Sequence, residues 1–128
     1  MILGLGIDLC DIRRVEKLFA RHGARFTQKY FTPAEYDYAM AQPHPVAALA
    51  KRWAAKEAAA KALGTGFRDG LFMRDIEIVN GKSGKPSLKF HGRAAQLKPS
   101  NSEFHLALTD EYPYALAQVI ISAHPKEF

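Results

Sequence analysis

The amino-acid sequence predicts a single α+β domain in which helices pack on a mostly antiparallel sheet. Three observations lead to this fold class: an apolar N-terminal stretch, a series of helical patterns after it, and four strand-like segments in the second half. Because the strands follow one another through short turns, they are expected to pair antiparallel. A length of 128 residues suffices for one modest core. We assign the domain to residues 1–122 and a C-terminal tail to residues 123–128.

The N-terminal stretch MILGLGI predicts a short central strand that is buried on both faces, because it is continuously apolar. Gly4 and Gly6 lie on one face of such a strand, so another element is expected to approach that face closely. Asp8 follows the strand. It is either a turn or helix-capping residue, or, if a second carboxylate such as Glu57 lies nearby, part of a ligand site.

Three short helices are expected next. The segment Asp11 to His22 combines an apolar face at helical spacing with a strongly basic opposite face. Residues 26–31 predict one or two further helical turns. The residues Thr32-Pro33-Ala34-Glu35 fit a capping box that starts a helix reaching about Met40. A proline-rich connector, residues 42–45, leads to the central helix.

The strongest helical signal lies in the stretch AALAKRWAAKEAAAKALGTG, where residues 46–63 contain no helix breaker. This alanine-rich segment predicts a core helix, yet it carries a charged stripe of Arg52, Lys56, Glu57 and Lys61. A carboxylate among cations, beside a glycine turn whose backbone can approach a ligand, fits a metal-bridged phosphate. The alternative is a solvated helix face with one surface ion pair.

The second half of the chain alternates between apolar and polar residues. This pattern predicts four strands, at residues 74–79, 87–91, 103–109 and 114–122, with a short helix at residues 92–97. The turn signals Asn-Gly and Asp-Glu-Tyr-Pro join the strands into hairpins.

Composition limits the classes of partner. The chain has 18 basic and 13 acidic residues and a formal charge of +5, which favours nucleic acid, a phosphorylated small molecule or an acidic protein. Cys10 is the only cysteine, so an intrachain disulfide is impossible, and a buried thiol is expected. No signal peptide or membrane-length apolar run is evident, so we expect a cytoplasmic protein without a membrane partner.

In combination and order, these motifs resemble the holo-[acyl-carrier-protein] synthases, the short bacterial type of 4'-phosphopantetheinyl transferase. The matching segments are GLGIDLCDIRRVE, AKRWAAKEAAAKALGTG, the tripeptide GKP and FHLALTDEYPYALAQVII. A G-x-D motif followed by [FW]-x-x-K-E-[AS]-x-x-K is specific to the superfamily, and the resemblance spans residues 1 to about 122. It implies the fold of these transferases, with a long central helix and further helices on a mostly antiparallel sheet.

The resemblance also implies an activity. Such enzymes transfer the 4'-phosphopantetheine arm of coenzyme A to a serine of apo acyl carrier protein in fatty acid biosynthesis, and adenosine 3',5'-bisphosphate is released. They use Mg²⁺, with Mn²⁺ as a substitute, and are typically homotrimers with active sites at subunit interfaces. A displacement of this kind demands positioning and charge neutralisation rather than a protein nucleophile. The chain accordingly needs no Ser-His-Asp or Cys-His constellation.

Site residues carry over at the matching positions. Asp8 and Glu57 resemble the two magnesium ligands, and Lys61 resembles the lysine that approaches the diphosphate. The positions that match contacts to coenzyme A are Arg52, Lys61, Gly64, Thr65, Gly66, Lys85, Pro86, His105 and Thr109. The positions that match the docking segment for the acidic carrier protein are Arg14, Lys17, Arg21, Phe26 and Lys29.

Two points stay open. Many relatives have a Ser/Thr-His pair in the penultimate strand, whereas this chain has Leu108-Thr109-Asp110, so only Thr109 is assigned there. The base that accepts the serine proton is Glu57, a metal-bound water or His105, since a base must lie within hydrogen-bond reach.

Two other classes of protein compete with the enzyme hypothesis. A basic nucleic-acid-binding module fits the charge but lacks a recognisable nucleic-acid-binding motif and leaves Asp8 and Glu57 without a role. A structural subunit of a larger assembly would carry the charged stripe on its surface. Magnesium-dependent binding of coenzyme A distinguishes both from the transferase.

Overall fold

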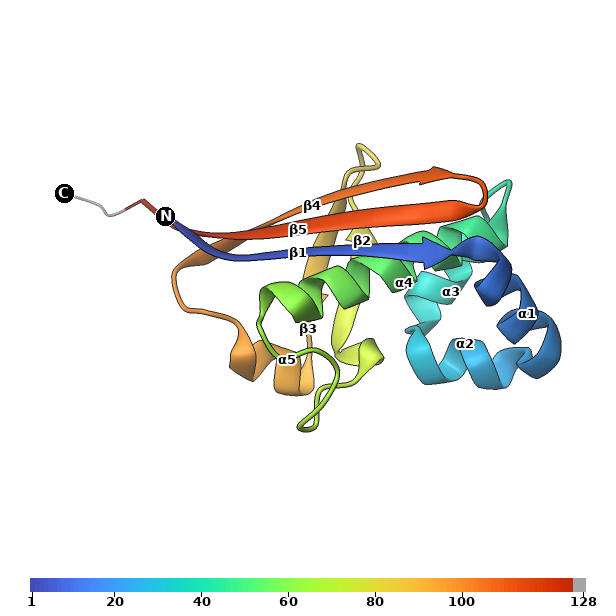
Figure 1. Ribbon diagram of the computed structural model, residues 1–128, viewed down its shortest axis with the longest axis horizontal. Helices are drawn as coiled ribbons and strands as arrows, with labels where there is room; N and C mark the ends of the chain where they lie inside the picture. The colour runs from blue at the N-terminus through green and yellow to red at the C-terminus, as the bar shows by residue number, and fades with distance from the viewer. Residues whose placement is uncertain (126–128) are drawn as a thin grey trace.

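The computed structural model describes residues 1–125 and contains a three-stranded antiparallel sheet of order β1-β5-β4 and a separate β2-β3 hairpin (Figure 1). This architecture confirms the predicted α+β class. The elements are β1 (Ile2–Asp11), α1 (Ile12–His22), α2 (Ala24–Tyr30), α3 (Pro33–Met40), α4 (Pro45–Ala62), a 3-10 turn η1 (Met73–Asp75), β2 (Ile76–Asn80), β3 (Pro86–Phe90), α5 (Gly92–Leu97), β4 (Ser102–Glu111) and β5 (Tyr114–Ala123).

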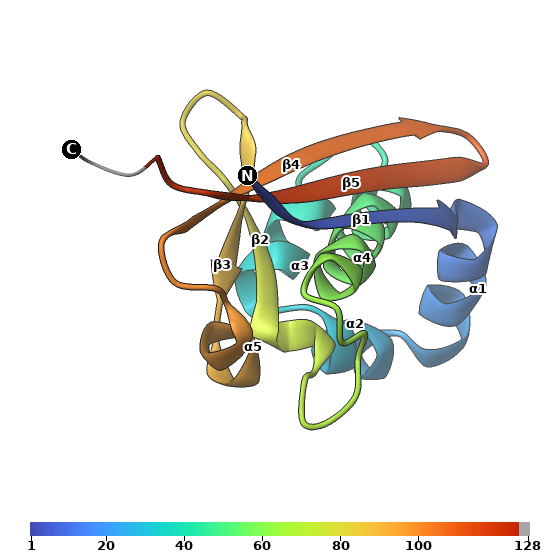
Figure 2. The ribbon, with the colours of Figure 1, turned by 60° about the vertical axis from the view of Figure 1, so that its left-hand side comes forward.

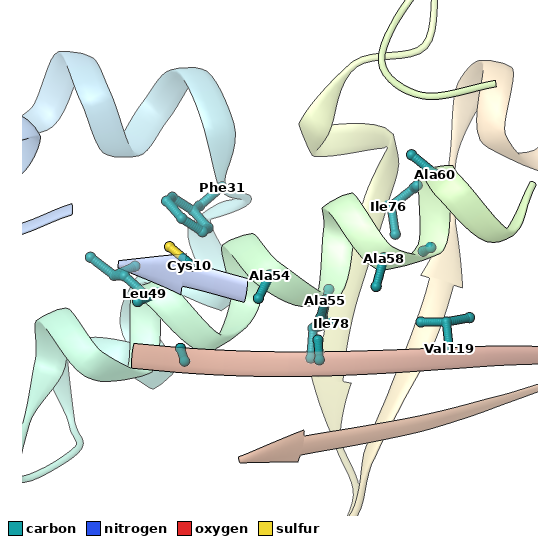
Figure 3. Packing of buried hydrophobic residues seen from close by; sticks show 14 of the residues in the cluster. Cys10, Phe31, Leu49, Ala54, Ala55, Ala58, Ala60, Ile76, Ile78 and Val119 are labelled. Atoms are coloured by element: carbon teal, nitrogen blue, oxygen red, sulfur yellow. The ribbon is translucent and has the colours of Figure 1, made fainter. Parts of the chain in front are cut away.

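Helix α4 is the centre of the molecule. It runs along one face of the three-stranded sheet, with α1 near one end of the sheet and the β2-β3 hairpin and α5 towards the other (Figure 2). Its alanines Ala54, Ala55, Ala58 and Ala59 are completely buried, and Figure 3 shows three of them, Ala54, Ala55 and Ala58, on α4 where it packs against β5 and β2. Small side chains on this helix allow both layers to approach it.

Strand β1 meets α4 backbone to backbone at Gly4 and Gly6. A Cβ atom at Gly6 would lie 1.8 Å from the carbonyl oxygen of Ala58, and one at Gly4 would lie 2.2 Å from that of Ala62. No side chain fits in either place. The close neighbour predicted for these glycines is therefore the central helix.

The prediction of a central strand buried on both faces is wrong. Strand β1 is an edge strand that pairs only with β5, and it continues to Asp11, so Asp8 lies inside it rather than after it. Its outward side chains, Leu3, Leu5, Ile7 and Leu9, are exposed. An apolar run with glycines on the inner face has the same sequence pattern as a fully buried strand, which explains the error.

The helical predictions are confirmed, because each rests on local signals. In the capping box of α3, the Glu35 amide donates to Thr32 Oγ1 at 3.2 Å, and the Thr32 amide donates to Glu35 Oε1 at 2.9 Å. Helix α4 starts at Pro45, inside the predicted connector, because proline suits the first turn of a helix. Cys10 is buried, as expected.

Strand boundaries are shifted by a few residues. Strand β2 begins after η1, two residues later than predicted, and β4 extends to Glu111, two residues into the predicted four-residue turn, whereas β5 begins at Tyr114 as predicted. Strand β5 ends at Ala123, the first residue assigned to the tail, and residues 126–128 of that tail lie outside the described residues.

Candidate active site

Asp8 and Lys61 meet where the edge strand β1 crosses the end of α4. The Lys61 ammonium donates to Asp8 Oδ1 at 3.1 Å and to the Ile7 carbonyl oxygen at 3.0 Å. Glu57 precedes Lys61 by one helical turn and therefore lies on the same side of α4. The glycine contact brings α4 against β1, so residues nearly fifty positions apart form one cluster.

The two carboxylates influence each other. Burial raises the pKa of Asp8 above its ordinary value, and the hydrogen bond and charge of Lys61 offset only part of this. Burial also raises the pKa of Glu57, and the negative charge of Asp8 raises it further, against the opposing charges of Lys61 and Arg14. Two carboxylates that repel each other are stabilised by a cation between them.

The donor set fits magnesium. Magnesium binds through one or two carboxylates together with water and substrate phosphate oxygens, rather than through an all-protein cage. Asp8 and Glu57 supply two carboxylates. Within residues 1–125 no group of three or more His, Cys, Asp or Glu side chains is placed to hold a metal ion, so the remaining donors would have to be water and substrate.

The four charged residues predicted to form one stripe on α4 lie on two sides of the helix. The prediction that Lys56 belongs to the same charged surface as Glu57 and Lys61 is wrong. This side chain is completely buried, and its ammonium donates to Glu35 Oε1 at 2.7 Å and to the carbonyl oxygens of Met73 and Ile76 at 2.9 and 2.6 Å. Burial lowers the pKa of Lys56, and the Glu35 carboxylate opposes that shift. Lys56 therefore joins α4 to α3 and β2 and takes no part in the cluster around Asp8.

Arg52 is also buried, at the floor of a hollow of about 350 Å³. Its guanidinium lies 4.0 Å from the centre of the Tyr38 ring and donates to Asn80 Oδ1, while its Nε has no hydrogen-bond partner among residues 1–125. Burial lowers the pKa of Arg52. Lys51 and Pro86 line the same hollow. A buried guanidinium with an unpaired donor suits an anionic ligand.

The turn Gly64-Thr65-Gly66 forms a second hollow with Lys61, of about 430 Å³. Both glycines have positive φ, 85° and 64°, so their conformation rather than close packing explains the residue type. The amides of Thr65 and Gly66 both donate to the Ala60 carbonyl oxygen, which caps α4. The donor left for a ligand is Thr65 Oγ1, which is buried and has no partner in the described part of the chain.

Two predicted contacts to coenzyme A lie elsewhere. His105 and Thr109 are exposed on β4 and face outward, away from α4, in the same side-chain rows as Leu5 and Leu9 of β1. His105 Nε2 lies 2.8 Å from Ser122 Oγ. A single copy of the chain therefore does not bring them to Asp8. Lys85 is exposed in the turn between β2 and β3, directly before Pro86.

The predicted docking residues Arg14, Lys17, Arg21 and Lys29 are exposed on α1 and α2. Phe26 is only 3% exposed and stacks on Trp53 with ring centres 6.0 Å apart, so its assignment as a surface contact is wrong. An apolar ring points inward from an amphipathic helix unless its neighbours leave it uncovered.

Sequence reasoning missed part of this surface. Arg14, His22, Arg25 and Trp53 line a hollow of about 350 Å³ between α1 and α2. The positions of Arg14 and His22, two turns apart on one helix face, could have indicated it. A further hollow of about 460 Å³ lies beside the β4-β5 turn, and none of the predicted site residues lines it.

Comparison with known proteins identifies the same family that the sequence motifs resemble. The profile of the 4'-phosphopantetheinyl transferase superfamily matches residues 4–117. A holo-[acyl-carrier-protein] synthase of Granulibacter bethesdensis is 50% identical over 133 residues, covering 98% of this chain and 92% of the relative.

Solved structures are similar over nearly the whole chain. The crystal structure of holo-[acyl-carrier-protein] synthase from Neisseria meningitidis has a TM-score of 0.86 and 35% identity, covering 95% of this chain and 99% of the other. That of Bacillus anthracis, in complex with CoA (3',5'-ADP), has a TM-score of 0.80 and 31% identity, covering 96% and 98%.

Proposed function

The chain belongs to the 4'-phosphopantetheinyl transferase superfamily, and from this premise we propose how its residues perform the reaction of a holo-[acyl-carrier-protein] synthase. The enzyme transfers the 4'-phosphopantetheine arm of coenzyme A to a serine of apo acyl carrier protein, and releases adenosine 3',5'-bisphosphate. A nucleic-acid-binding function has no support from these relatives. The observation that carries the proposal is the convergence of Asp8 with Glu57 and Lys61 between β1 and α4.

Asp8 and Glu57 would hold a magnesium ion, with manganese as a substitute. Bound there, the ion would withdraw charge from the diphosphate and stabilise the leaving bisphosphate. Lys61 would add a point charge to the same diphosphate. Glu57 forms no hydrogen bond within residues 1–125, so one of its oxygens would hold the metal ion and the other would accept the serine proton, directly or through a bound water.

The two hollows along α4 would bind the rest of coenzyme A. Thr65 Oγ1 and Lys61 would lie beside the diphosphate, and Arg52 would receive a phosphate of the nucleotide with its unpaired Nε. Pro86 forms one wall of the Arg52 hollow, and the exposed Lys85 adjoins it.

We propose that the carrier protein docks on the exposed cations of α1 and α2. Acyl carrier proteins are acidic, and a row of cations steers such a partner and fixes its orientation. Arg14 is the cation of this row that also acts electrostatically on Asp8 and Glu57. The partner would thus meet the enzyme beside the reacting groups. A fatty acid biosynthetic role in the cytoplasm follows from this partner.

We propose a homotrimer in which the outer face of the β1-β5-β4 sheet is the subunit interface. Leu5, Ile7 and Leu9 are each more than half exposed on this face, and such a patch of apolar side chains is uncommon on a monomer. His105 and Thr109 lie on the same face, on the opposite edge strand from Asp8. A neighbouring copy could then bring its His105 to the coenzyme A bound at the edge of β1.

Intact-mass spectrometry tests the reaction. Apo acyl carrier protein is incubated with the enzyme and coenzyme A, with magnesium in one sample and EDTA in the other. A mass gain of one phosphopantetheine arm is expected only with magnesium. Absence of any gain with several acidic carrier proteins would refute the proposal. In the part of the chain described, residues 1–125, no helix is both long enough and apolar enough to cross a membrane.

Mixing of variants tests the shared site. Asp8→Asn and His105→Ala trimers are each expected to have low activity. After unfolding and refolding together, about a quarter of the sites should combine an intact Asp8 with an intact His105 from the neighbour. No recovery on mixing would contradict the shared site, and a monomer by light scattering would contradict the trimer.

A further inference from the structure

We propose that Lys61 occupies the Asp8 carboxylate in the ligand-free enzyme and competes with the metal ion for it, so that tight metal binding requires the diphosphate of coenzyme A. This inference rests on the proposed function and concerns the order in which that site is filled. It arises from the contact between Lys61 and Asp8 rather than from the reaction.

The contact is specific. The Lys61 ammonium has two acceptors on β1, Asp8 Oδ1 at 3.1 Å and the Ile7 carbonyl oxygen at 3.0 Å. The Asp8 side chain is 17% exposed, so the ammonium closes one side of a carboxylate that has little other access to water. Lys61 itself is half exposed and can swing away at small cost.

The second carboxylate has no such partner. Glu57 forms no ion pair with any of residues 1–125, although Lys61 lies one turn further along α4. The Lys61 ammonium thus pairs with Asp8 and leaves the Glu57 carboxylate unpaired within residues 1–125. A metal ion that needs both must share Asp8 with the ammonium.

Simultaneous binding of the metal ion and the Lys61 ammonium to Asp8 is unfavourable unless an anion is also bound. A divalent ion on Asp8 would lie close to an ammonium bound to the same carboxylate, and like charges at this separation repel strongly when partly buried. A diphosphate removes the conflict, because it offers Lys61 other oxygens and separates the two cations. Binding of metal and of coenzyme A should therefore be coupled, and the coupling must be reciprocal.

Manganese binding to the free enzyme, measured by electron paramagnetic resonance at fixed pH, tests the competition. Lys61→Met should bind Mn²⁺ about fivefold more tightly than the wild type when coenzyme A is absent, which is the factor expected from loss of one partly exposed ion pair. Addition of coenzyme A should increase Mn²⁺ affinity in the wild type, and less so in Lys61→Met.

Lys51→Met is the matched control. Lys51 lies on the same helix, about 15 Å from Lys61 along its axis. It pairs with Asp110 at 3.2 Å, so this variant loses an equal charge and a similar contact. Its Mn²⁺ affinity without coenzyme A should stay within about twofold of the wild type, because the remaining effect is screened.

The outcomes separate the two proposals. If Asp8→Asn leaves Mn²⁺ affinity unchanged, the metal assignment in the proposed function fails, and the competition fails with it. If Asp8→Asn weakens binding but Lys61→Met binds no more tightly than Lys51→Met, the metal site stands and the competition is refuted. A wild type and a Lys61→Met variant that both bind no Mn²⁺ without coenzyme A would also refute it.

Discussion

Replacement of Lys56 by methionine should destabilise the protein by about 3–5 kcal/mol, the cost of breaking a buried ion pair by removal of one partner. We expect a loss of stability in the upper part of this range, because the Lys56 ammonium forms three hydrogen bonds and is completely buried. The variant loses all three hydrogen bonds of the ammonium, including those to the carbonyl oxygens of Met73 and Ile76, and of these two only the Met73 oxygen keeps another donor within residues 1–125, the Ile76 amide. It also leaves Glu35, 1% exposed, as a buried carboxylate without its ion-pair partner, and Arg52 then remains as a nearby positive charge.

A second substitution tests whether the uncompensated charge is the main cost. Glu35→Gln removes the negative charge and keeps one acceptor oxygen for one of the two backbone amides, those of Thr32 and Ile78, from which Glu35 now accepts. The double variant Glu35→Gln/Lys56→Met should therefore be more stable than Lys56→Met alone, by about 1–3 kcal/mol. Loss of the carbonyl contacts should keep it below the wild type.

Urea denaturation followed by far-UV circular dichroism measures these differences. Protein concentration is held fixed, because association of subunits changes apparent stability. In thermal scans the single variant should melt about 10–20 °C below the wild type. Lys51→Met, which loses an exposed pair, should change stability by about 1 kcal/mol or less. A double variant that is no more stable than Lys56→Met would refute the reasoning from buried charge.

Three further predictions concern the site, the docking surface and acid stability. Glu57→Gln should abolish transfer in the mass assay while its circular dichroism spectrum stays unchanged; near-normal activity would remove Glu57 from the metal site. Arg21→Glu, two helical turns from Arg14, should raise KM for the carrier protein about tenfold at low salt and leave KM for coenzyme A unchanged; equal effects on both substrates would argue against docking. Burial raises the pKa of Glu77, but hydrogen bonds from Thr32 and His91 outweigh burial and hold that pKa below its usual 4.5. A carboxyl whose pKa is lower in the folded than in the unfolded state stabilises the fold at pH values above its unfolded pKa. This stabilisation is lost as the pH falls from the unfolded pKa through the folded pKa. Glu77→Gln should therefore lose less stability than the wild type between pH 5.5 and 3.5 in urea titrations, and equal losses would contradict this role.

Sequence reasoning succeeded where the signal was local. The capping box at Thr32 and Glu35 and the alanine-rich helix were predictable because their hydrogen bonds and propensities involve neighbours in sequence. The juxtaposition of Asp8 and Glu57 was also predictable, because paired glycines on β1 indicate that another backbone comes close.

The errors all concern tertiary partners. Lys56 resembles its neighbours on α4 in sequence, yet its ammonium is neutralised by Glu35 from another helix. The inward position of Phe26 depends on its contact with Trp53. A single sequence contains no local signal for such contacts.

The contact of β1 with α4 has a consequence for how the site responds to ligands. Since peptide groups rather than side chains separate Gly6 from Ala58, the spacing between the carboxylate-bearing segments is independent of rotamers. The two segments, β1 and α4, are already held in place when the protein has folded. Ligand binding therefore needs to orient only the side chains of Asp8 and Glu57. Preorganisation of this kind makes the backbone beneath the site rigid. The only parts of the site that can adjust to a ligand are then the side chains of Asp8, Glu57 and Lys61.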